Sequence, residues 1–524
     1  MLNSTTLRQL ILVLGMLTCL QAPVSKAAPA FLTTSAIDSF RTVIASSKYE
    51  KSRLHQLLWG KHYRPVWQVP VRARLLDLSR DGGGLRPLEK GGSFQTKNLR
   101  LVNPAGKEYV IRSIDKDPTK SLPPKWQKTF IAALLQDQTS VIHPYGALIV
   151  PVLAEAAGVY HTNPELVIVP DDPALGEFRQ EFAGMLALFE ERPEGDQQEE
   201  TSFGNSSKVV SSRKMFGQLV ASPCHQVDRR RYLRARLFDM WLGDWSRRED
   251  QWRWASFQTG DRTVYQAIPR DRDHAFFKFN DGLLTWLISQ VKTKYQSFHK
   301  KIGPVAGLAK SAYPMDAYFL APLSRQDFRE IADSLQQSLT DEVIGQAIRT
   351  WPDQVYALSG TAFAEKLISR RRQLPQVAEE YYRLLAREVL LPGTDKKEKF
   401  LVERLNANQT KVTIYSRSDS NCFNLLLAER TFHRSETKSI SLFGLAGKDI
   451  FELSGEASTG LEVRIYDGAG EDKIRGKSRS RKTRLYDAGD GNEIAQGLRA
   501  KHIHHAPQAK EFSGAGWLLR HRLE

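Results

Sequence analysis

Cysteine is scarce in this chain of 524 residues, which contains only Cys19, Cys224 and Cys422. A framework of several disulfides, of the kind that holds small secreted domains together, is therefore excluded. Cys19 lies in an N-terminal segment that we expect to be removed. The sequence leaves open whether Cys224 and Cys422 form one bridge or remain thiols. Stability must come from hydrophobic cores, for which a composition of 41% hydrophobic residues is sufficient.

Long hydrophobic runs are absent beyond the N-terminus. There, Arg8 precedes a mostly apolar run from Leu10 to Leu20 and the small-residue stretch Ser25–Ala28, which is the layout of a secretory signal peptide. The run is shorter than the roughly 20 apolar residues that a membrane-spanning helix needs. We therefore expect residues 1–27 to be a signal peptide and the mature chain to have no transmembrane segment. The expected location is the periplasm or the outer membrane surface.

No single run collects the excess of positive charge, although the formal charge is +16 and the pI is about 9.6. Such a charge fits attraction to nucleotides, lipid phosphates or anionic envelope polymers, and it equally fits a dispersed, solvated surface. The expected partners are an envelope protein, lipid or polysaccharide of unknown identity, together with an anionic surface. Nucleic acid is not favoured, and the oligomeric state stays open.

The order of predicted elements indicates an α+β fold with a larger and a smaller part. Strands at 99–102 and 108–114, joined by the turn Asn103–Gly106, belong to a strand-rich lobe over 40–194. The acidic and Ser/Asn-rich residues 195–212 predict a flexible connection, and helical periodicity dominates a second lobe over 213–391.

Beyond Pro392, alternating apolar and polar residues with Gly/Asp turns predict a smaller β-rich domain over 392–497, followed by a basic tail over 498–524. Similar turns at Gly447, Gly470 and Gly491 recur roughly every 20 residues, which indicates stacked β rungs or meander strands. The smaller domain is therefore expected to be antiparallel or solenoid-like.

Four segments of the larger part together supply what phosphoryl transfer needs: a glycine turn, a cation, a polar catalytic loop and acidic metal ligands. They are residues 91–97, Arg112 at the end of a predicted strand, residues 243–254 after an amphipathic helix, and residues 268–276 after another strand. Each also has an ordinary interpretation, as a hairpin turn, an edge-strand cation or a network of ion pairs.

These segments resemble known families. Residues 93–97 resemble the Gly-x-Gln-x-Lys loop of HipA-type kinases, with Ser93 at the expected glycine. Residues 243–251 resemble the Gly-Asn-x-Asp-Arg-His-x-x-Asn loop of HipA, phosphatidylinositol kinases and secretory-pathway casein kinases, and residues 268–276 resemble their metal-binding segment. Nearly the whole mature chain is similar to an uncharacterised bacterial envelope family, some members of which also carry a metallophosphoesterase domain or a BamA-like barrel.

The resemblance implies a two-lobed atypical kinase-like domain with ATP and Mg²⁺ as cofactors. It implies that Gly92, Gln95 and Lys97 form the phosphate loop and that Arg112 replaces the phosphate-pairing lysine. The other implied positions are Glu190 or Glu191 near the nucleotide hinge, Asp271 as metal ligand with Asp273 in reserve, and Gln251 as second metal ligand. The acid that pairs with Arg112 would be Glu155 or Asp137, unless Glu155 is simply solvated.

The catalytic loop departs from the family pattern. Ser246 stands where the catalytic aspartate is expected and Arg248 where the histidine is expected. Asp244 or Asp250 is the alternative base, but proton transfer requires contact within about 3 Å. Two functions therefore stay open. One is Mg²⁺-dependent nucleotide binding with phosphoryl transfer to an unknown envelope substrate. The other is an inactive pseudokinase that binds or scaffolds envelope proteins, linked to outer-membrane assembly.

One calcium-type motif occurs in the smaller domain. Gly468–Ile474 matches the Gly-x-Gly-x-Asp-x-Ile pattern of calcium-binding β-rolls. Because the neighbouring copies are imperfect, ordinary Gly/Asp turn chemistry is favoured over calcium.

Overall fold

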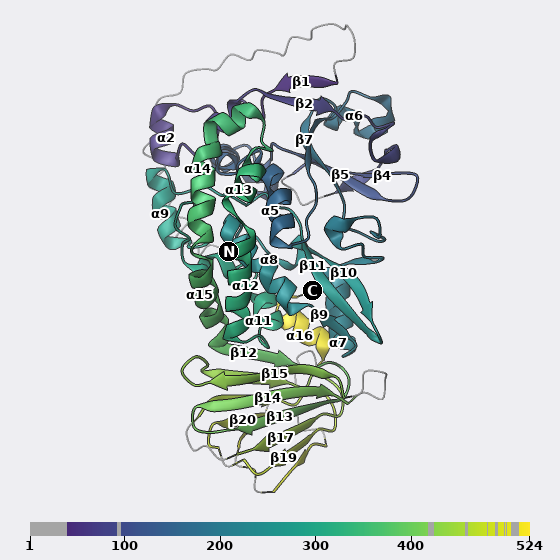
Figure 1. The fold of residues 1–524 in the computed structure, drawn as a ribbon, viewed down its shortest axis with the longest axis vertical. Coiled ribbons are helices and arrows are strands. Elements are labelled where there is room, and N and C mark those ends of the chain that lie inside the picture. Colours follow the sequence, from purple (N-terminus) through teal and green to yellow (C-terminus); the bar gives the residue numbers. More distant parts are fainter. Residues whose placement is uncertain are drawn as a thin grey trace. The chain divides into compact units, whose positions relative to one another are not determined.

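The computed structural model describes residues 39–524 except 92–95, 418–423, 456–459, 479, 488–490, 497, 499, 505–512 and 524. Within this part of the chain the strands form four sheets, and residues 40–524 form one compact unit (Figure 1). The fold mixes helices and strands, as the sequence predicts. Cys224 is disulfide-bonded, and Cys422 lies outside the described residues.

The first sheet has seven strands in the order β1-β2-β6-β7-β5-β4-β3. The predicted hairpin is confirmed, because β4 and β5 pair in antiparallel register with Asn98 opposite Arg112. Strand β7 starts at Leu186 and carries Glu190 and Glu191 at its end. The bounds are β1 (Phe40–Val43), β2 (Val71–Leu75), β3 (Arg86–Gly91), β4 (Asn98–Val102), β5 (Glu108–Ser113), β6 (Glu165–Ile168) and β7 (Leu186–Glu191).

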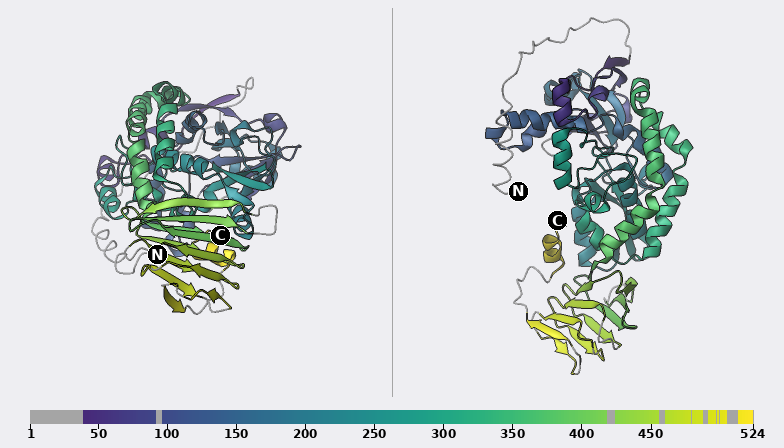
Figure 2. Two further views of the ribbon diagram at one scale, coloured as in Figure 1. Left: turned by 60° about the horizontal axis from the view of Figure 1, so that its bottom comes forward. Right: turned by 90° about the vertical axis from the view of Figure 1, so that its left-hand side faces the viewer.

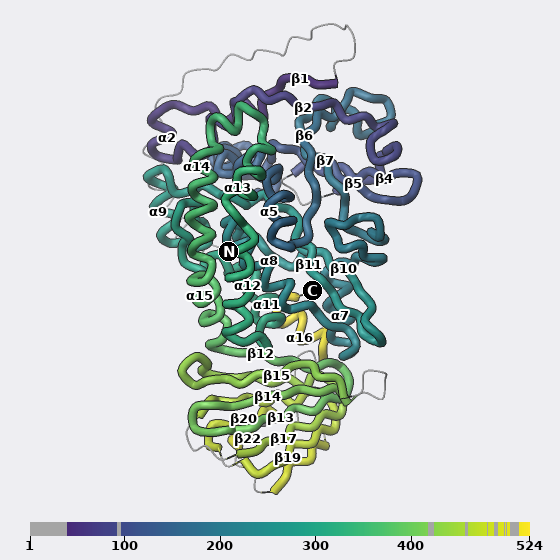
Figure 3. Tube along the Cα trace, in the orientation of Figure 1, coloured from purple at the N-terminus to yellow at the C-terminus, as the bar shows by residue number. Residues whose placement is uncertain are grey.

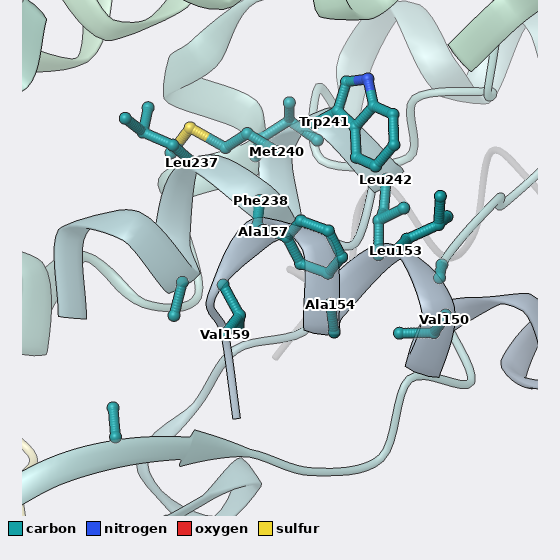
Figure 4. Close-up of a cluster of buried hydrophobic side chains, with 14 of the residues drawn as sticks. Val150, Leu153, Ala154, Ala157, Val159, Leu237, Phe238, Met240, Trp241 and Leu242 are labelled. Atoms are coloured by element: carbon teal, nitrogen blue, oxygen red, sulfur yellow. The ribbon is translucent and has the colours of Figure 1, made fainter. Parts of the chain in front are cut away.

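Short helices accompany this sheet: α2 (Arg53–Trp59), α3 (Arg64–Gln68), α4 (Phe130–Asp137), α5 (Val150–Ala157) and α6 (Arg179–Phe182). Among the described residues, the stretch Phe130–Ala157 is long and apolar enough to cross a membrane, and 61% of its most apolar window is buried inside the fold. Its residues Leu153, Ala154 and Ala157 belong to the same buried cluster as Phe238 and Leu242 (Figure 4).

The second sheet has four strands in the order β8-β10-β11-β9. Its bounds are β8 (Val209–Ser211), β9 (His225–Val227), β10 (Trp252–Thr259) and β11 (Arg262–Pro269), with helices α7 (Ser212–Ala221) and α8 (Arg229–Leu242) between the strands. Trp252 lies opposite Pro269 in the β10–β11 hairpin. This register brings the segment before β10 next to the segment after β11.

Residues 195–212, expected to be a flexible connection, have regular structure instead. They include a 3-10 helix at Thr201–Phe203 and strand β8, which pairs with β10. Phe203 is fully buried, and the Ser206 hydroxyl donates to the Ser256 carbonyl over 3.1 Å. The acidic and Ser-rich composition concealed these few apolar side chains, which are enough to hold the segment against β10.

The residues that follow are mainly helical, as the sequence predicts for the second lobe, although the helix ends differ from the periodicity in several places. Pro375 lies in the first turn of α15, where proline costs no hydrogen bond. Helix α9 ends at Val291, and residues from Glu388 form a strand inside the range predicted for the helical lobe. The bounds are α9 (Leu283–Val291), α10 (Val305–Ala309), α11 (Tyr313–Phe319), α12 (Arg325–Ser338), α13 (Asp341–Ile348), α14 (Asp353–Arg371) and α15 (Leu374–Ala386).

Two further sheets make up the β-rich region. One contains β12 (Glu388–Pro392), β16 (Ser439–Phe443), β18 (Glu462–Tyr466), β20 (Thr483–Asp487) and β22 (Lys501–His504). The other contains β15 (Leu426–His433), β14 (Gln409–Ser416), β13 (Glu398–Arg404), β17 (Ile450–Ser454), β19 (Lys473–Gly476) and β21 (Glu493–Ile494). From β16 onward the chain alternates between the two sheets and each of these strands pairs in parallel (Figure 3). A meander would pair consecutive strands in antiparallel fashion, so parallel pairing agrees with the stacked rungs that the sequence offered as one of two alternatives.

The repeated turns of this region stack through their side chains. The Glu398 N–H donates to Asp449 Oδ1 over 2.6 Å, and the Asp449 N–H donates to Asp472 Oδ1 over 2.7 Å. The Asp472 N–H donates to Asn492 Oδ1 over 2.9 Å. The weak sequence repeat therefore marks a ladder in which each polar side chain accepts a backbone hydrogen bond from the preceding rung.

The basic end, expected to be a tail from residue 498, contains described structure. Strand β22 pairs with β20, and α16 (Gly514–Arg520) packs on α7. The indole of Trp517 is buried, with its ring centroid 4.9 Å from that of Tyr318. Trp517 and Leu518 supply the apolar area that the surrounding basic and histidine residues concealed in the sequence.

Glu398 at the start of this ladder predicts a pH-dependent stability. Its carboxyl is fully buried, and burial raises its pKa to about 8. The stability that the protonated form contributes is complete below the unfolded pKa and is lost as the pH rises towards 8. We expect Glu398→Gln to match the wild type near pH 5 and to gain about 1.4 kcal/mol or more relative to it near pH 9.

Chemical denaturation at both pH values measures this difference. Glu403→Gln, on the less buried face of the same strand, is the matched control. Equal pH dependence in the two variants would show that the Glu398 carboxyl is not protonated in the folded chain.

Candidate functional site

A cavity of about 170 Å³ lies where the two sheets of the larger part meet, and we refer to it as the cleft. Three groups of residues line it. Strands β4 and β5 contribute Asn98, Arg100, Val110 and Arg112, and Thr162 with residues Glu190–Pro193 forms a second side. The third side is formed by Asp250, Gln251, Arg270, Asp271 and Asp273. Several residues that the sequence places far apart are thus brought together.

Arg112 is held by two acids of the cleft. Its guanidinium lies 2.8 Å from Glu190 Oε1 and 3.2 Å from Asp271 Oδ1. Burial raises the pKa of Glu190, although Arg112 and the Thr162 hydroxyl, which donates over 2.6 Å, act the other way. Arg112 therefore connects the end of strand β7 to the segment after β11.

The acids considered as partners for Arg112 are used elsewhere. Glu155 accepts from His161 over 3.2 Å, and its side chain is 79% exposed because the other face of α5 packs into the core. Asp137 receives two hydrogen bonds from Arg64, at 2.6 and 2.7 Å. Neither Glu155 nor Asp137 lines the cleft.

Glu191 lies beside Glu190 and also lines the cleft. Its Oε1 accepts from the backbone N–H and the side-chain amide of Asn163, both over 2.8 Å. Both glutamates stand at the end of β7, where the chain leaves the first sheet towards β8. Asn163 holds Glu191, whereas Arg112 holds Glu190.

Of the three residues expected in the phosphate loop, the structure describes only Lys97, and it does not line the cleft. Gly92 and Gln95 lie outside the described residues, and the flanking Gly91 and Thr96 line the cleft. Lys97 is exposed, and its ammonium donates to the Glu181 carbonyl over 3.4 Å, beside a different cavity. Successive residues of an extended chain point to opposite faces, so Lys97 faces away from the cleft that Thr96 and Asn98 line.

The catalytic loop is anchored by a buried carboxylate that the sequence did not single out. Asp239 on α8 lies 3.1 Å from both Arg236 and Arg247, and it also pairs with Arg272. The network continues to Asp316, which lies 2.9 Å from Arg236 and accepts from the Tyr232 hydroxyl over 2.7 Å. Helix α8 was predicted to be amphipathic, but Arg236 and Asp239 are both interior.

Asp244, one of the two alternative bases, belongs to the same interior. It is fully buried, pairs with Arg247 and does not line the cleft. Burial raises its pKa to about 6, with a contribution from the charge of Asp239, although Arg247 acts the other way. Asp244 also accepts the N–H of Ser246 over 3.1 Å. Its carboxylate thus stabilises the loop from inside.

The other loop residues lie nearer to solvent. Ser246 is half-buried and is not part of the cleft lining. Asp250 is exposed, lines the cleft and lies 2.9 Å from Arg248. Gln251 lines the cleft as well, and its carbonyl accepts the N–H of Arg270 over 2.9 Å. Asp250 is therefore the alternative base that faces the cavity.

Asp271 and Asp273 form an acidic pair beside the cleft. Asp271 has a φ of 51°, a left-handed conformation that a non-glycine residue adopts only at a cost. Against the effect of burial, Arg112 and Lys116 hold the pKa of Asp271 well below its usual value, whereas burial and the charge of Asp271 raise that of Asp273. Lys116 also forms an ion pair with Asp273.

Asp271 Oδ1 is buried, and its contact within the described residues is the ion pair with Arg112 at 3.2 Å. No cluster of three or more His, Cys, Asp or Glu side chains suited to a metal occurs in the described part of the chain. Mg²⁺ does not need such a cluster, because it takes one or two carboxylates together with substrate phosphates and water. The donor set of Asp271, Asp273 and Gln251 fits that chemistry.

Arg270 was recognised in the sequence only as a member of a conceivable ion-pair network. It lines the cleft, and its guanidinium forms no ion pair or hydrogen bond with the residues that the structure describes. Burial, together with the charges of Arg253 and Arg112, lowers its pKa to about 10. A cation in this state is available to an anionic ligand.

Comparisons with known proteins were made for the whole chain. Neither the protein-family models nor the curated proteins gave a match. A search of solved structures found the crystal structure of a Helicobacter pylori proinflammatory kinase, CtkA, at 11% sequence identity and a TM-score of 0.28. The similarity covers 56% of this chain and 94% of that chain.

The Asp239 network predicts a large effect on stability. In Asp239→Ala, three arginines lose a shared buried carboxylate, and breaking a buried pair from one side typically costs about 3–5 kcal/mol. Urea denaturation should show a loss of this size. Asp333→Ala, at a partly exposed position of α12, is the control and should change stability by less than about 0.5 kcal/mol. A similar small effect in Asp239→Ala would contradict the assigned anchoring role.

Proposed function

We propose that the larger part of this chain is a kinase-like domain that binds a nucleoside triphosphate together with Mg²⁺ in the cleft. One observation carries the proposal: Arg112, Gln251, Asp271 and Asp273 come from three separate segments and converge on one cavity. The proposed setting is the periplasm or the outer membrane surface, which rests on the N-terminal sequence alone.

Some of the cleft residues suit the phosphates of such a ligand, and others suit its Mg²⁺ ion. Arg112 and Arg270 supply positive charge for phosphate oxygens, and arginine can bind two of these oxygens at once. Asp271 and Asp273 supply carboxylate oxygens for Mg²⁺, whose bound charge would neutralise phosphates. A cation at Asp271 competes with Arg112 for that carboxylate and leaves Arg112 available to the ligand.

The residues of the predicted catalytic loop, 243–251, make phosphoryl transfer slow or absent. Ser246 cannot hold negative charge, and Asp244 is occupied by Arg247 inside the fold. We therefore propose a pseudokinase that binds its nucleotide and serves as a binding or scaffold protein of the envelope. The parallel stacking of the β-rich region supports a solenoid-like module as the scaffold surface.

A second candidate is active phosphoryl transfer, favoured by one observation. Asp250 is exposed and lines the cleft. If a substrate hydroxyl approached it within hydrogen-bond distance, this carboxylate would accept the proton. Its pairing with Arg248 is between exposed groups and is worth little, so it does not prevent this use.

Binding of ATP with Mg²⁺ tests the proposal. Isothermal titration should show Mg²⁺-dependent binding, which Asp271→Ala abolishes and Arg270→Ala weakens by about tenfold to 100-fold, since one charge-assisted contact is worth roughly 1.5–3 kcal/mol. Lys97→Ala is the control and should bind normally, because its side chain faces away from the cleft. Absence of Mg²⁺-dependent binding in the wild type would reject the proposal.

Phosphate transfer distinguishes the two candidates. With ATP and a general protein acceptor, a pseudokinase gives no phosphate transfer. Ser246→Asp should then introduce measurable transfer, because it restores a carboxylate where the kinase pattern has its catalytic aspartate. The active alternative instead gives wild-type transfer that falls by about 100-fold or more in Asp250→Asn. Transfer by the wild type that Asp250→Asn leaves unchanged would contradict both assignments.

A further inference from the structure

Two neighbouring helices present an apolar surface to solvent. On α2, Leu54 and Leu57 are 64% and 67% exposed. On α9, the exposed large apolar residues are Leu283, Trp286, Leu287 and Val291. The α9 residues recur with helical spacing and therefore share one face. We call these six residues the α2–α9 face.

Helices α2 and α9 lie next to each other (Figures 1 and 2). Specific contacts fix the position of one helix against the other. A Cβ atom on Gly282, before α9, would lie 2.2 Å from the backbone nitrogen of Gly60, after α2. Only glycine permits that approach. The His62 N–H donates to Asp281 over 2.7 Å, and the His62 ring lies 2.6 Å from the same carboxylate.

The surroundings of this face carry positive charge. No acidic residue occurs between Glu50 and Asp77, the stretch that contains α2, or between Asp281 and Asp316, the stretch that contains α9. The second stretch also holds five lysines. Arg53 begins α2, Lys61 follows it and Lys292 follows α9, and none of the three forms an ion pair with another residue in the described chain.

Nearby acids do not offset this charge. Asp281 is paired with His62 and, at 3.2 Å, with Lys278. Asp137, which contacts His55 on α2 over 2.8 Å, is also bound by Arg64. The face thus combines exposed leucine, valine and tryptophan with unpaired cations. A protein partner would need an apolar patch surrounded by acidic residues. A membrane with anionic headgroups provides both an apolar interior for the exposed side chains and negative charge for the cations.

We propose that the α2–α9 face docks the protein on the surface of a membrane containing anionic phospholipid. The apolar side chains enter the boundary between headgroups and acyl chains, where tryptophan is favoured. Arg53, Lys61 and Lys292 pair with lipid phosphates, their alkyl stems lying along the apolar surface. None of these residues lines the cleft, so docking is independent of nucleotide binding.

Vesicle co-sedimentation tests this proposal with the chain from Ala28 onward, so that the N-terminal apolar run cannot contribute. The probes are vesicles of phosphatidylcholine alone and of phosphatidylcholine mixed with phosphatidylglycerol. We expect binding to the mixed vesicles that weakens with salt and falls by about tenfold or more in Trp286→Ser/Val291→Ser. Arg53→Glu/Lys292→Glu should lose binding to the mixed vesicles as well.

Leu358→Ser is the matched control, since Leu358 is 53% exposed on α14, outside this face. It should bind like the wild type. Thermal unfolding of each variant separates lost binding from lost folding, and Leu57→Ser on α2 provides a second test of the same face. Failure to bind mixed vesicles, or equal binding by all variants, overturns the proposal. So does a dimer, measured by light scattering, that the Trp286→Ser/Val291→Ser change disrupts, because the face would then cover a second copy.

Discussion

Asp239 pairs with Arg236, Arg247 and Arg272, and these ion pairs join helix α8, the loop before β10 and the segment after β11. All four side chains are buried. Charges removed from water are stable only when their partners are all in place, so the carboxylate sets the spacing of three chain segments at once. The cleft depends on that spacing, because Asp250, Gln251 and Asp271 belong to two of these segments. Its geometry is therefore fixed before any ligand arrives.

The same reasoning explains why the cleft is small. Its acids and arginines pair largely with one another, and its volume of about 170 Å³ is below the roughly 300–1,000 Å³ of ordinary ligand pockets. A ligand must replace some of these pairs, so its phosphates and cation have to match the charges that they displace. This favours a phosphate-bearing ligand with a bound cation over an apolar one.

The β-rich region obeys a different constraint. Parallel strands leave each turn with backbone donors that the sheets do not use, and the Asp449, Asp472 and Asn492 side chains accept them from rung to rung. Burial of these carboxyl groups raises the pKa of Asp449 and Glu398. The ladder is most stable where those acids keep their protons. The polar repeat is thus a structural device, in which each side chain accepts a backbone hydrogen bond from the adjoining rung.

The sequence by itself determined the local features: the hairpin of β4 and β5, the helical character of the second lobe and the spacing of the repeated turns. These follow from periodicity and turn chemistry, which act over a few neighbouring residues. Short motifs that resemble kinase segments pointed to seven of the residues that line the cleft: Arg112, Glu190, Glu191, Asp250, Gln251, Asp271 and Asp273. Tertiary structure alone decided which side chains form ion pairs with one another and which of them face the cleft or the interior. Arg112 pairs with Glu190 and Asp271 rather than Glu155, Lys97 faces away from the cleft, and Asp239 is interior. The reason is physical: an ion pair between residues distant in sequence depends on how sheets and helices pack, and on which charges that packing removes from water.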